Sequence, residues 1–585
     1  MTSSQTFGNF STCPVGEEAS MAQVLTYLDR PWLKSYKLGP YKLETSLAPY
    51  PKEPVFAVLD KAAENYPTQT AILYLGRSIQ YRELRGQVDR LAAALSKLGV
   101  QKGDRVCLFL PNCPEFILGD WAILKAGAAV VPTSILRSDE GLLHEVGSSN
   151  AKIVICREDM LERVLAAREK SSIEQIIVTS CDGYDVADVA GPLPRGVHKL
   201  RKLLAENEAV PPQVDIDPEV DLCELAFTGG ATGIPKGVMV THYNRYSCIH
   251  LGFPWALKPL NRGFVGKASL FIALPMFHAM GHYAHQAGAH LGLRIILLPD
   301  PRNTEMIVNY LKEYRPFIIP AVPTQFMRIA QADLGRMNAL LLSGAAPLPL
   351  EVSEAIKKKT GMPISQAYGL TETSPLTHLN LSAFAKITGF MAKEKAGIGV
   401  PAPDTECRLV HSETGQDVPF GQPGEMLVRG PQIMRGYWPT PGSGLDAEGW
   451  LHTGDIAVMD EEGYFQLVDR VKDMANISGM KVYTIQVDEA LFRHPAVLMA
   501  AAIGVPDPEI PGSERIMAFV TLKEAYKGRV SAEEIKNFCR QHLAPYAVPT
   551  FVEFRDALPL TVSEKVFKKA LRDEIIAQMK VGGDQ

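Results

Sequence analysis

Hydrophobic and polar positions alternate in two ways through the first two-thirds of the chain. Short apolar runs rich in β-branched residues predict strands, and the segments between them have the periodicity of amphipathic helices. In 81–98, for example, Leu84, Val88, Leu91, Ala92 and Leu95 fall on one helical face. Such strands separated by helices indicate largely parallel sheets covered on both faces. Strands are expected at 106–110, 153–156, 176–179, 270–274, 294–298, 317–319 and 339–342, and helices at 81–98, 115–125, 304–314 and 350–359.

The pattern changes after about residue 397. Residues 398–470 carry many Gly and Pro turn signals between short alternating strands at 407–410, 425–428, 456–459 and 464–468, which indicates a small antiparallel barrel or a distorted sheet. Beyond the charged stretch 469–473, helices at 486–492 and 532–541 and strands at 499–503 and 517–522 predict an α+β domain. The expected fold class is α/β: a large N-terminal domain (1–469) with two layered, mostly parallel sheet subdomains to about 397 and a β-barrel-like subdomain at 398–469, then an α+β C-terminal domain (474–585).

Composition narrows the class of protein. A chain of 585 residues, 46% hydrophobic and 21% charged, fits a soluble globular enzyme of several subdomains. A net charge of −5 gives no bulk reason to expect nucleic acid as a partner. Nine dispersed cysteines without metal-like spacing, and an acidic start, predict a cytoplasmic protein without a signal peptide. The apolar stretch 117–136 contains Asp120 and Lys125, so no integral membrane segment is expected. Peripheral membrane contact stays open.

The most informative motif is Phe227-Thr-Gly-Gly-Ala-Thr-Gly-Ile-Pro-Lys-Gly-Val238. Glycines allow successive backbone N–H groups to turn toward an anion, and Lys236 adds a movable positive charge. Pro235 before the lysine and Gly237 after it exclude the Walker A pattern. The sequence therefore predicts a phosphate-binding loop of another kind.

Five further segments follow in order, each with side chains suited to part of a nucleotide or acyl site. In chain order, the segments contain an imidazole, small residues at a strand end, an aromatic ring next to a carboxylate, an aspartate that ends its motif, and a lysine near the C-terminal end of the chain. They are Leu274-Pro-Met-Phe-His-Ala-Met-Gly281, Ser343-Gly-Ala-Ala-Pro347, Gln366-Ala-Tyr-Gly-Leu-Thr-Glu-Thr373, Trp450-Leu-His-Thr-Gly-Asp455 and Pro559-Leu-Thr-Val-Ser-Glu-Lys565.

Together the six motifs resemble those of the acyl-adenylate-forming superfamily, which includes acyl-CoA synthetases, firefly luciferase and the adenylation domains of peptide synthetases. The resemblance is nearly collinear from about Tyr81 to Arg572. It implies that ATP and a small-molecule carboxylic acid react to acyl-AMP, with CoA as the later acceptor and Mg²⁺ as the metal. It also implies a monomer or a homodimer.

The resemblance assigns roles residue by residue. The triphosphate contacts are expected from the glycine-rich loop, the metal contact from Glu372 and a phosphate contact from Thr371. Tyr368 is expected to stack on adenine, Asp455 with Arg470 to bind the ribose hydroxyls, and Lys565 to stabilise the charge that forms between carboxylate and α-phosphate. The complete set of ATP-binding residues is Thr228, Gly229, Gly230, Ala231, Thr232, Gly233, Lys236, Gly344, Ala345, Ala346, Pro347, Gln366, Ala367, Tyr368, Gly369, Asp455 and Arg470.

The second half-reaction has its own expected residues. Residues 470–473 would form a hinge around Lys472, about which the C-terminal domain rotates between the two steps. Rotation would withdraw Lys565 and bring in Ser478, Gly479 and Lys481 to bind CoA, while His278 gates the entry of its thiol. The acyl pocket is expected to involve Trp255, Ser343 and Gly369.

Each of these residues also has a plain structural interpretation. His278 and Trp255 could be core side chains, Tyr368 and Gly369 a turn, and Asp455 a cap. Lys565 could belong to a solvated basic helix face with Lys568, Lys569 and Arg572. Glu564 stands where relatives have glycine, so a strained backbone or a competing carboxylate would slow adenylation.

The sequence is best interpreted as an AMP-forming acyl-CoA synthetase, an ATP-dependent carboxylic acid–CoA ligase, acting on a fatty or medium-chain acid. Two alternatives stay open within enzymes: a ligase that loads a carrier-protein thiol, and an oxidative, luciferase-like branch. A third, from another class, is a degenerate nucleotide-binding sensor without turnover.

Overall fold

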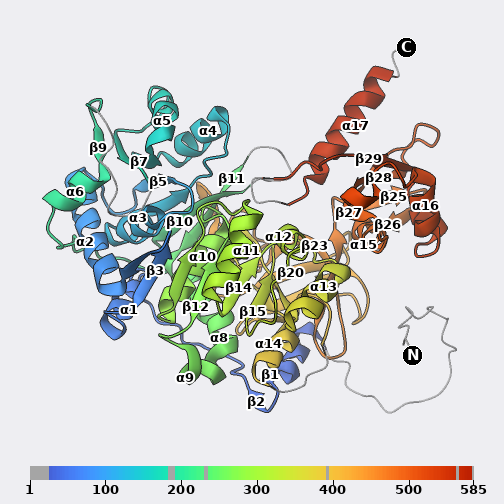
Figure 1. Cartoon of the computed structure of the whole chain (residues 1–585), viewed down its shortest axis with the longest axis horizontal. Helices are drawn as coiled ribbons and strands as arrows, with labels where there is room; N and C mark the ends of the chain where they lie inside the picture. The colour runs from blue at the N-terminus through green and yellow to red at the C-terminus, as the bar shows by residue number, and fades with distance from the viewer. Residues whose placement is uncertain (1–25, 182–191, 229–234, 390–393, 562–564, 583–585) are drawn as a thin grey trace.

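Two nine-stranded sheets form the centre of the fold (Figure 1). The structure, a computed structural model, describes residues 26–181, 192–228, 235–389, 394–561 and 565–582. The first sheet has the order β22-β21-β11-β10-β6-β5-β7-β8-β9 and is parallel from β10 to β9. Its strands are β5 (Arg105–Phe109), β6 (Ala129–Pro132), β7 (Ile153–Arg157), β8 (Gln175–Thr179), β9 (Val197–Lys199), β10 (Leu222–Thr228), β11 (Lys236–Thr241), β21 (Gly436–Tyr437) and β22 (Thr440–Pro441).

The second sheet has the order β18-β17-β16-β15-β14-β12-β13-β3-β4, with a parallel centre from β16 to β3. Antiparallel strands close both of its edges. Its strands are β3 (Thr70–Tyr74), β4 (Arg77–Gln80), β12 (Ser269–Ile272), β13 (Arg294–Leu297), β14 (Ile318–Ala321), β15 (Leu340–Ser343), β16 (Ile364–Tyr368), β17 (His378–Leu379) and β18 (Val400–Pro401).

Helices pack between and around these sheets. In α2 (Tyr81–Lys97) the predicted apolar face is buried, because Leu84, Val88, Leu91 and Leu95 point into the core. The helix α10 (Ala279–His290) contacts β12 and β13 on one side and α1 and α7 on the other, so it lies inside the molecule. The other main helices of this part are α1 (Ala57–Asn65), α3 (Pro114–Lys125), α4 (Asp139–Ser149), α5 (Leu161–Arg168), α6 (Leu200–Glu206), α7 (His242–Leu251), α8 (Phe253–Leu257), α9 (Asn261–Phe264), α11 (Thr304–Tyr314), α12 (Pro323–Ile329), α13 (Leu350–Thr360) and α14 (Leu381–Ile387).

A third, smaller sheet follows. It is antiparallel in the order β19-β20-β23-β24, with register shifts in the β20–β23 and β23–β24 pairs. Within the described residues β19 and β24 are edge strands of this sheet, so it is an open, distorted one. Its strands are β19 (Glu406–Val410), β20 (Gly424–Arg429), β23 (Leu451–Met459) and β24 (Phe465–Arg470).

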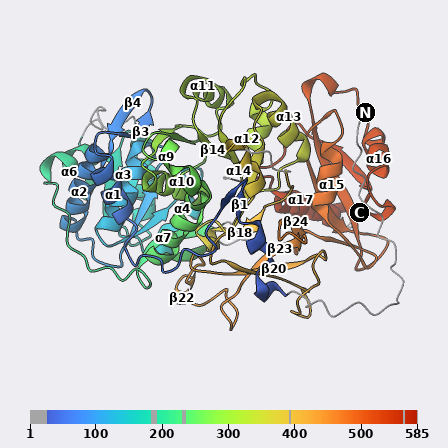
Figure 2. The ribbon, with the colours of Figure 1, turned by 90° about the horizontal axis from the view of Figure 1, so that it is seen from below.

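The C-terminal region has an α+β core of its own. A hairpin, β25 (Ala475–Ile477) and β26 (Met480–Val482), precedes the sheet β27 (Val497–Pro506), β28 (Glu514–Leu522) and β29 (Phe551–Phe554). The helices α15 (Thr484–Phe492), α16 (Ala532–Arg540) and α17 (Lys568–Gly582) accompany it. Figures 1 and 2 both place this region at one end of the long axis, with α2 and α6 at the other.

The expected α/β class, with a large N-terminal part and a separate α+β C-terminal part, is confirmed. Every helix and strand expected above occurs, with ends shifted by a few residues; the strand expected at 464–468, for instance, is Phe465–Arg470. None of the helices in the described ranges combines the length and apolar character that a bilayer crossing requires.

Candidate active site

The phosphate-binding loop connects the two strands of a hairpin. Thr228, the last residue of β10, pairs with Lys236, the first of β11. Five of the predicted ATP contacts lie outside the described residues: Gly229, Gly230, Ala231, Thr232 and Gly233. The flanking pair fixes where the loop leaves and rejoins the sheet.

Tyr437 brings this hairpin to Glu372. The Lys236 ammonium lies 5.1 Å from the centre of the Tyr437 ring, over its face. The Tyr437 hydroxyl donates a 2.8 Å hydrogen bond to Oε1 of Glu372. Burial and the nearby Glu372 carboxylate raise the pKa of Tyr437, so its hydroxyl remains a donor at neutral pH. Glu372 follows Thr371 in a short 3₁₀ turn, Thr371–Thr373.

The side chains predicted to bind adenosine, those of Tyr368, Asp455 and Arg470, form one hydrogen-bonded cluster. The Tyr368 hydroxyl donates to Oδ2 of Asp455 at 2.6 Å, and Nε of Arg470 donates to Oδ1 at 2.7 Å. Asp455 and Arg470 are register partners across β23 and β24. Each carboxylate oxygen accepts more than one hydrogen bond, so Asp455 keeps capacity for the two hydroxyls of a ribose. Burial is the main cause of the raised pKa of Tyr368, and Asp455 adds to it.

Small residues at the ends of β15 and β16 form a wall beside this cluster. A Cβ on Gly344 would meet the carbonyl oxygen of Ala367 at 3.2 Å, and one on Gly369 would meet that of Pro375 at 1.9 Å. Gly369 therefore cannot carry a side chain without backbone movement. Gln366 lies opposite Ser343 in the parallel ladder. Ala345 adopts φ +73°, and Ala346 and Pro347 continue the same turn toward α13.

Lys565 reaches the same place from the C-terminal region. Its backbone N–H donates to Oγ1 of Thr561 at 3.1 Å. Burial, with the nearby Arg470 guanidinium, lowers the pKa of the Lys565 ammonium to about 8, while Asp455 and Glu372 oppose that shift. The charges that act on Lys565 are thus those of the predicted nucleotide site. Glu564 lies outside the described residues.

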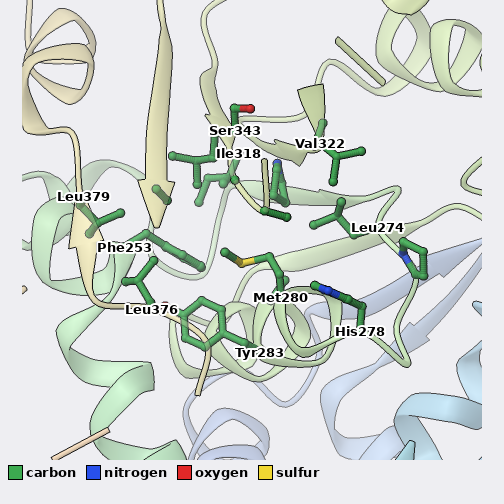
Figure 3. Close-up of a pocket in the computed structure, with 18 residues that line it drawn as sticks. Phe253, Leu274, His278, Met280, Tyr283, Ile318, Val322, Ser343, Leu376 and Leu379 are labelled. Atoms are coloured by element: carbon green, nitrogen blue, oxygen red, sulfur yellow. The ribbon is translucent and has the colours of Figure 1, made fainter. Parts of the chain in front are cut away.

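An apolar pocket opens next to this wall (Figure 3). It encloses about 670 Å³ of space, including the part open to solvent. Figure 3 shows Met280 between Phe253 on one side and Leu274 and His278 on the other. The lining consists of Phe253, Leu274, Pro275, His278, Met280, Tyr283, Ala284, Ile318, Pro320, Ala321, Val322, Leu342, Ser343, Gly344, Ala345, Ala367, Leu376 and Leu379.

His278 is the only imidazole in that lining. It caps the N-terminus of α10, where its backbone N–H donates to the Pro275 carbonyl. Burial, and then Lys565, lower the pKa of His278 to about 3, so its ring is neutral at physiological pH. A neutral imidazole between the apolar pocket and Lys565 presents one donor and one acceptor to a ligand.

Two expected pocket residues lie outside the lining. Trp255 is 2% exposed, donates from its indole N–H to the Glu44 carbonyl at 3.0 Å and packs edge-on against Tyr36. Its role in the structure is that of a core tryptophan. Gly369 contacts Pro375 instead of the pocket, whereas Ser343 does line it.

The expected CoA contacts lie on the hairpin of β25 and β26 in the C-terminal region. Ser478 and Gly479 form the two-residue turn between β25 and β26, both with positive φ. Lys481 lies 3.7 Å from Oε1 of Glu413. Lys472, at the expected hinge, follows the last residue of β24 by two positions, and burial lowers its pKa.

Comparison with known proteins decides the family. The family described as "AMP-binding enzyme" matches residues 59–438, and its "AMP-binding enzyme C-terminal domain" matches residues 486–565. This chain belongs to the AMP-binding enzyme family. It is an ATP-dependent, AMP-forming CoA ligase.

Similar relatives span almost the whole chain. A long-chain-fatty-acid–CoA ligase of Bacillus subtilis is 33% identical over 573 residues, covering 93% of this chain and 98% of the relative. A feruloyl-CoA synthase of an Amycolatopsis species is 31% identical over 522 residues, covering 88% and 97%. Among solved structures, ATP-bound MatB from Rhodopseudomonas palustris superposes with a TM-score of 0.77 at 26% identity, covering 89% of this chain and 98% of that one.

Sequence reasoning missed Tyr437 and most of the pocket. Tyr437 stands in the segment Arg435-Gly-Tyr-Trp438 and was assigned no contact in the site, because Glu372, its hydrogen-bond partner, lies 65 positions away in the sequence. The pocket lining also includes side chains from α8, α10, β14, β15 and β17 that stand outside the six motifs, such as Phe253, Tyr283, Ile318, Leu342 and Leu379.

Proposed function

We propose that this enzyme activates a fatty acid, with ATP, to an acyl-adenylate and then transfers the acyl group to CoA. The main support for a fatty acid as substrate is the apolar pocket that Gly344 and Ala345 help to line. Among the described residues that line it, His278, Ser343 and Tyr283 have polar side chains and the others are apolar. None of them carries a charge at neutral pH. A dicarboxylate would leave its second charge unpaired there, whereas an alkyl chain gains about 25 cal/mol for each Å² of surface it buries.

The long-chain fatty acid ligases among the relatives support the same choice. In the first step the carboxylate oxygen attacks the α-phosphorus of ATP and pyrophosphate leaves. Two anions approach one another, so fixed positive charge is the main way to lower the barrier. Lys565 would supply that charge near the α-phosphate, and Lys236 would supply it at the glycine-rich loop.

The ribose would be held by Asp455, which Tyr368 and Arg470 orient through their hydrogen bonds. Gly344 to Pro347 and Gln366 to Gly369 would form the walls around adenine. Thr228 and Thr371 would add hydroxyl contacts to the phosphates.

The donor set also fits a magnesium ion. Glu372 offers a half-buried carboxylate whose Oε1 is oriented by Tyr437, and carboxylate oxygen is a preferred Mg²⁺ ligand. Bound there with ATP, the ion would neutralise part of the triphosphate charge.

In the second step the CoA thiol attacks the acyl carbonyl and AMP leaves. Lys565 lies near Arg470, Asp455 and Glu372, so under this proposal the C-terminal region would turn about Lys472 to withdraw it. The same movement would carry Ser478, Gly479 and Lys481 to the pocket mouth, with His278 between thiol and acyl chain.

A substrate panel tests the proposal. Pyrophosphate release is measured with saturated acids from six to eighteen carbons, with malonate, and with benzoate and ferulate, each with and without CoA. We expect the highest kcat/KM with a fatty acid. Preference for ferulate, benzoate or malonate would overturn the choice of acid, and dependence on a holo-carrier protein instead of free CoA would overturn the choice of acceptor.

A further inference from the structure

A network of buried charged side chains lies beneath the candidate active site. It combines Asp120 of α3, Glu224 of β10, Arg245 of α7 and His282 of α10. Each is at most 1% exposed to solvent. Charges this deep are costly unless they compensate one another, so their pairing determines which protonation states the fold allows.

His282 bridges the two acids of this network. Its Nδ1 lies 2.9 Å from Oε1 of Glu224, and its Nε2 lies 2.7 Å from Oδ1 of Asp120. Ionised carboxylate oxygens only accept hydrogen bonds, so both ring nitrogens must donate. A ring that donates from both nitrogens is an imidazolium.

The remaining contacts complete the charge balance. Arg245 forms an ion pair with Oε2 of Glu224, so two carboxylates face one guanidinium and one imidazolium. His285 stacks on His282 and lies 3.1 Å from Oδ2 of Asp120, and burial lowers its pKa, which keeps it neutral. The Gln286 amide donates to the same oxygen at 2.9 Å. The net charge of the network is then zero.

Three members of the network connect to different parts of the site. Glu224 lies four residues before Thr228, where β10 enters the phosphate-binding loop. The His282 backbone N–H donates to the carbonyl of His278, one turn earlier on the pocket side. Arg245 donates to the carbonyl of Ser374 at 3.1 Å, directly after the turn that holds Glu372.

We propose that His282 is a positioning residue for acyl-adenylate formation. Held as an imidazolium between Asp120 and Glu224, it fixes α10 against β10 and α3. His278, Thr228 at the end of β10 and the Glu372 turn then keep their mutual positions while carboxylate and ATP react. The kinetic test of this proposal rests on the proposed function, whereas the protonation state of His282 is argued from the contacts above alone.

The protonation state can be measured on the unmodified protein. Histidine-selective ¹⁵N labelling is expected to show one buried histidine with both ring nitrogens protonated at pH 8, a signal absent from His282→Gln. Absence of such a signal in the wild type would overturn the proposal. So would a stoichiometric divalent metal ion in the purified protein, because Asp120, His282 and His285 present ligand atoms within 4.8 Å of one another.

The kinetic test compares two substitutions on the same helix. His282→Gln is expected to lower the pyrophosphate-exchange rate by about a hundredfold, because small misplacements of reacting groups have effects of that size. His290→Gln, two turns further along α10 and packed against His250, is expected to keep the wild-type rate. Circular dichroism establishes that each variant is folded. A folded His282→Gln variant within twofold of the wild type would contradict the proposal.

The pH dependence of activity distinguishes a positioning role of His282 from a role in protein stability alone. In Asp120→Asn the imidazolium loses one of its two anions, so its positive charge is less stabilised. The variant is expected to lose activity with rising pH through an ionisation that the wild type lacks, because a neutral ring makes the weaker hydrogen bond. A profile parallel to that of the wild type would contradict a positioning role. If the wild type activates no fatty acid, the proposed function fails, while the ¹⁵N measurement still decides the state of His282.

Discussion

Tyr368 donates a 2.6 Å hydrogen bond to Asp455 although the two residues lie 87 positions apart. This bond joins the end of β16 in the second large sheet to β23 in the small distorted sheet. Two motifs that sequence reasoning treated separately are thereby one structural unit. Because Arg470 occupies the other oxygen of Asp455, the carboxylate has a fixed orientation before any nucleotide arrives.

Removing the Tyr368 hydroxyl tests that unit. A hydrogen bond to a charged group contributes about 1.5–3 kcal/mol, so Tyr368→Phe is expected to lower kcat/KM for ATP about ten- to a hundredfold. The matched control is Tyr27→Phe, because the Tyr27 hydroxyl donates to the Val418 carbonyl, a contact that the proposed site does not use. Equal effects of the two substitutions in a pyrophosphate-release assay would show that the Tyr368–Asp455 bond has no special role.

The lowered pKa of Lys565 predicts a pH dependence. The charged ammonium is the useful form, and it is lost as pH rises through its pKa of about 8. The rate of pyrophosphate formation, measured as kcat/KM for the free enzyme, is therefore expected to decline above about pH 8. Lys565→Arg keeps its charge throughout this range and is expected to be slower but to show no such decline. An identical decline in both proteins would assign the ionisation to another group.

The turn between β25 and β26 predicts a separation of the two half-reactions. Gly479 has φ +86° and nothing within 4 Å of an added Cβ, so Gly479→Leu adds bulk without a clash, at a backbone strain of about 1–3 kcal/mol. We expect normal acid-dependent pyrophosphate exchange and at least tenfold slower thioester formation. Gly512→Leu is the control, because Gly512 has φ +80° and the same open surroundings in the same region. Loss of pyrophosphate exchange in Gly479→Leu would contradict the alternation of domains.

Pocket size predicts chain-length preference. Ala284 lines the pocket and Ala287 lies nearly one turn later on the same buried helix without lining it. Either alanine replaced by leucine overpacks the core at a cost of about 1–3 kcal/mol. Only Ala284→Leu is expected to shift the preferred acid toward shorter chains in the substrate panel. A shift of the same size in Ala287→Leu would mean that general disruption, not pocket volume, sets the preference.

Much of the fold could be predicted because each strand and helix has a local pattern. The apolar face of 81–98 and the runs at 106–110 and 153–156 appear where periodicity places them. The site motifs were also local: strand end, glycines, one aromatic residue, one carboxylate. Their convergence could be inferred only from a family resemblance, because pairs such as Tyr368 and Asp455 share no sequence signal.

What could not be predicted depends on tertiary contacts. Trp255 was a candidate for the acyl pocket, and only the structure shows its indole hydrogen-bonded to Glu44 in the core. His282 stands outside the six motifs, and only the structure places Asp120 and Glu224 on either side of its ring. The effect of Glu564 beside Lys565 on the adenylation step stays a prediction.

The most direct test of the central claim is acid-dependent exchange of labelled pyrophosphate into ATP, measured for the wild type, Asp455→Ala and Lys565→Ala. The account predicts exchange in the wild type with a fatty acid and none without it. It also predicts a loss of about a hundredfold or more in each variant, since each removes a stabilising group from the same reaction. Exchange that is independent of added acid, or that survives both substitutions, would contradict it.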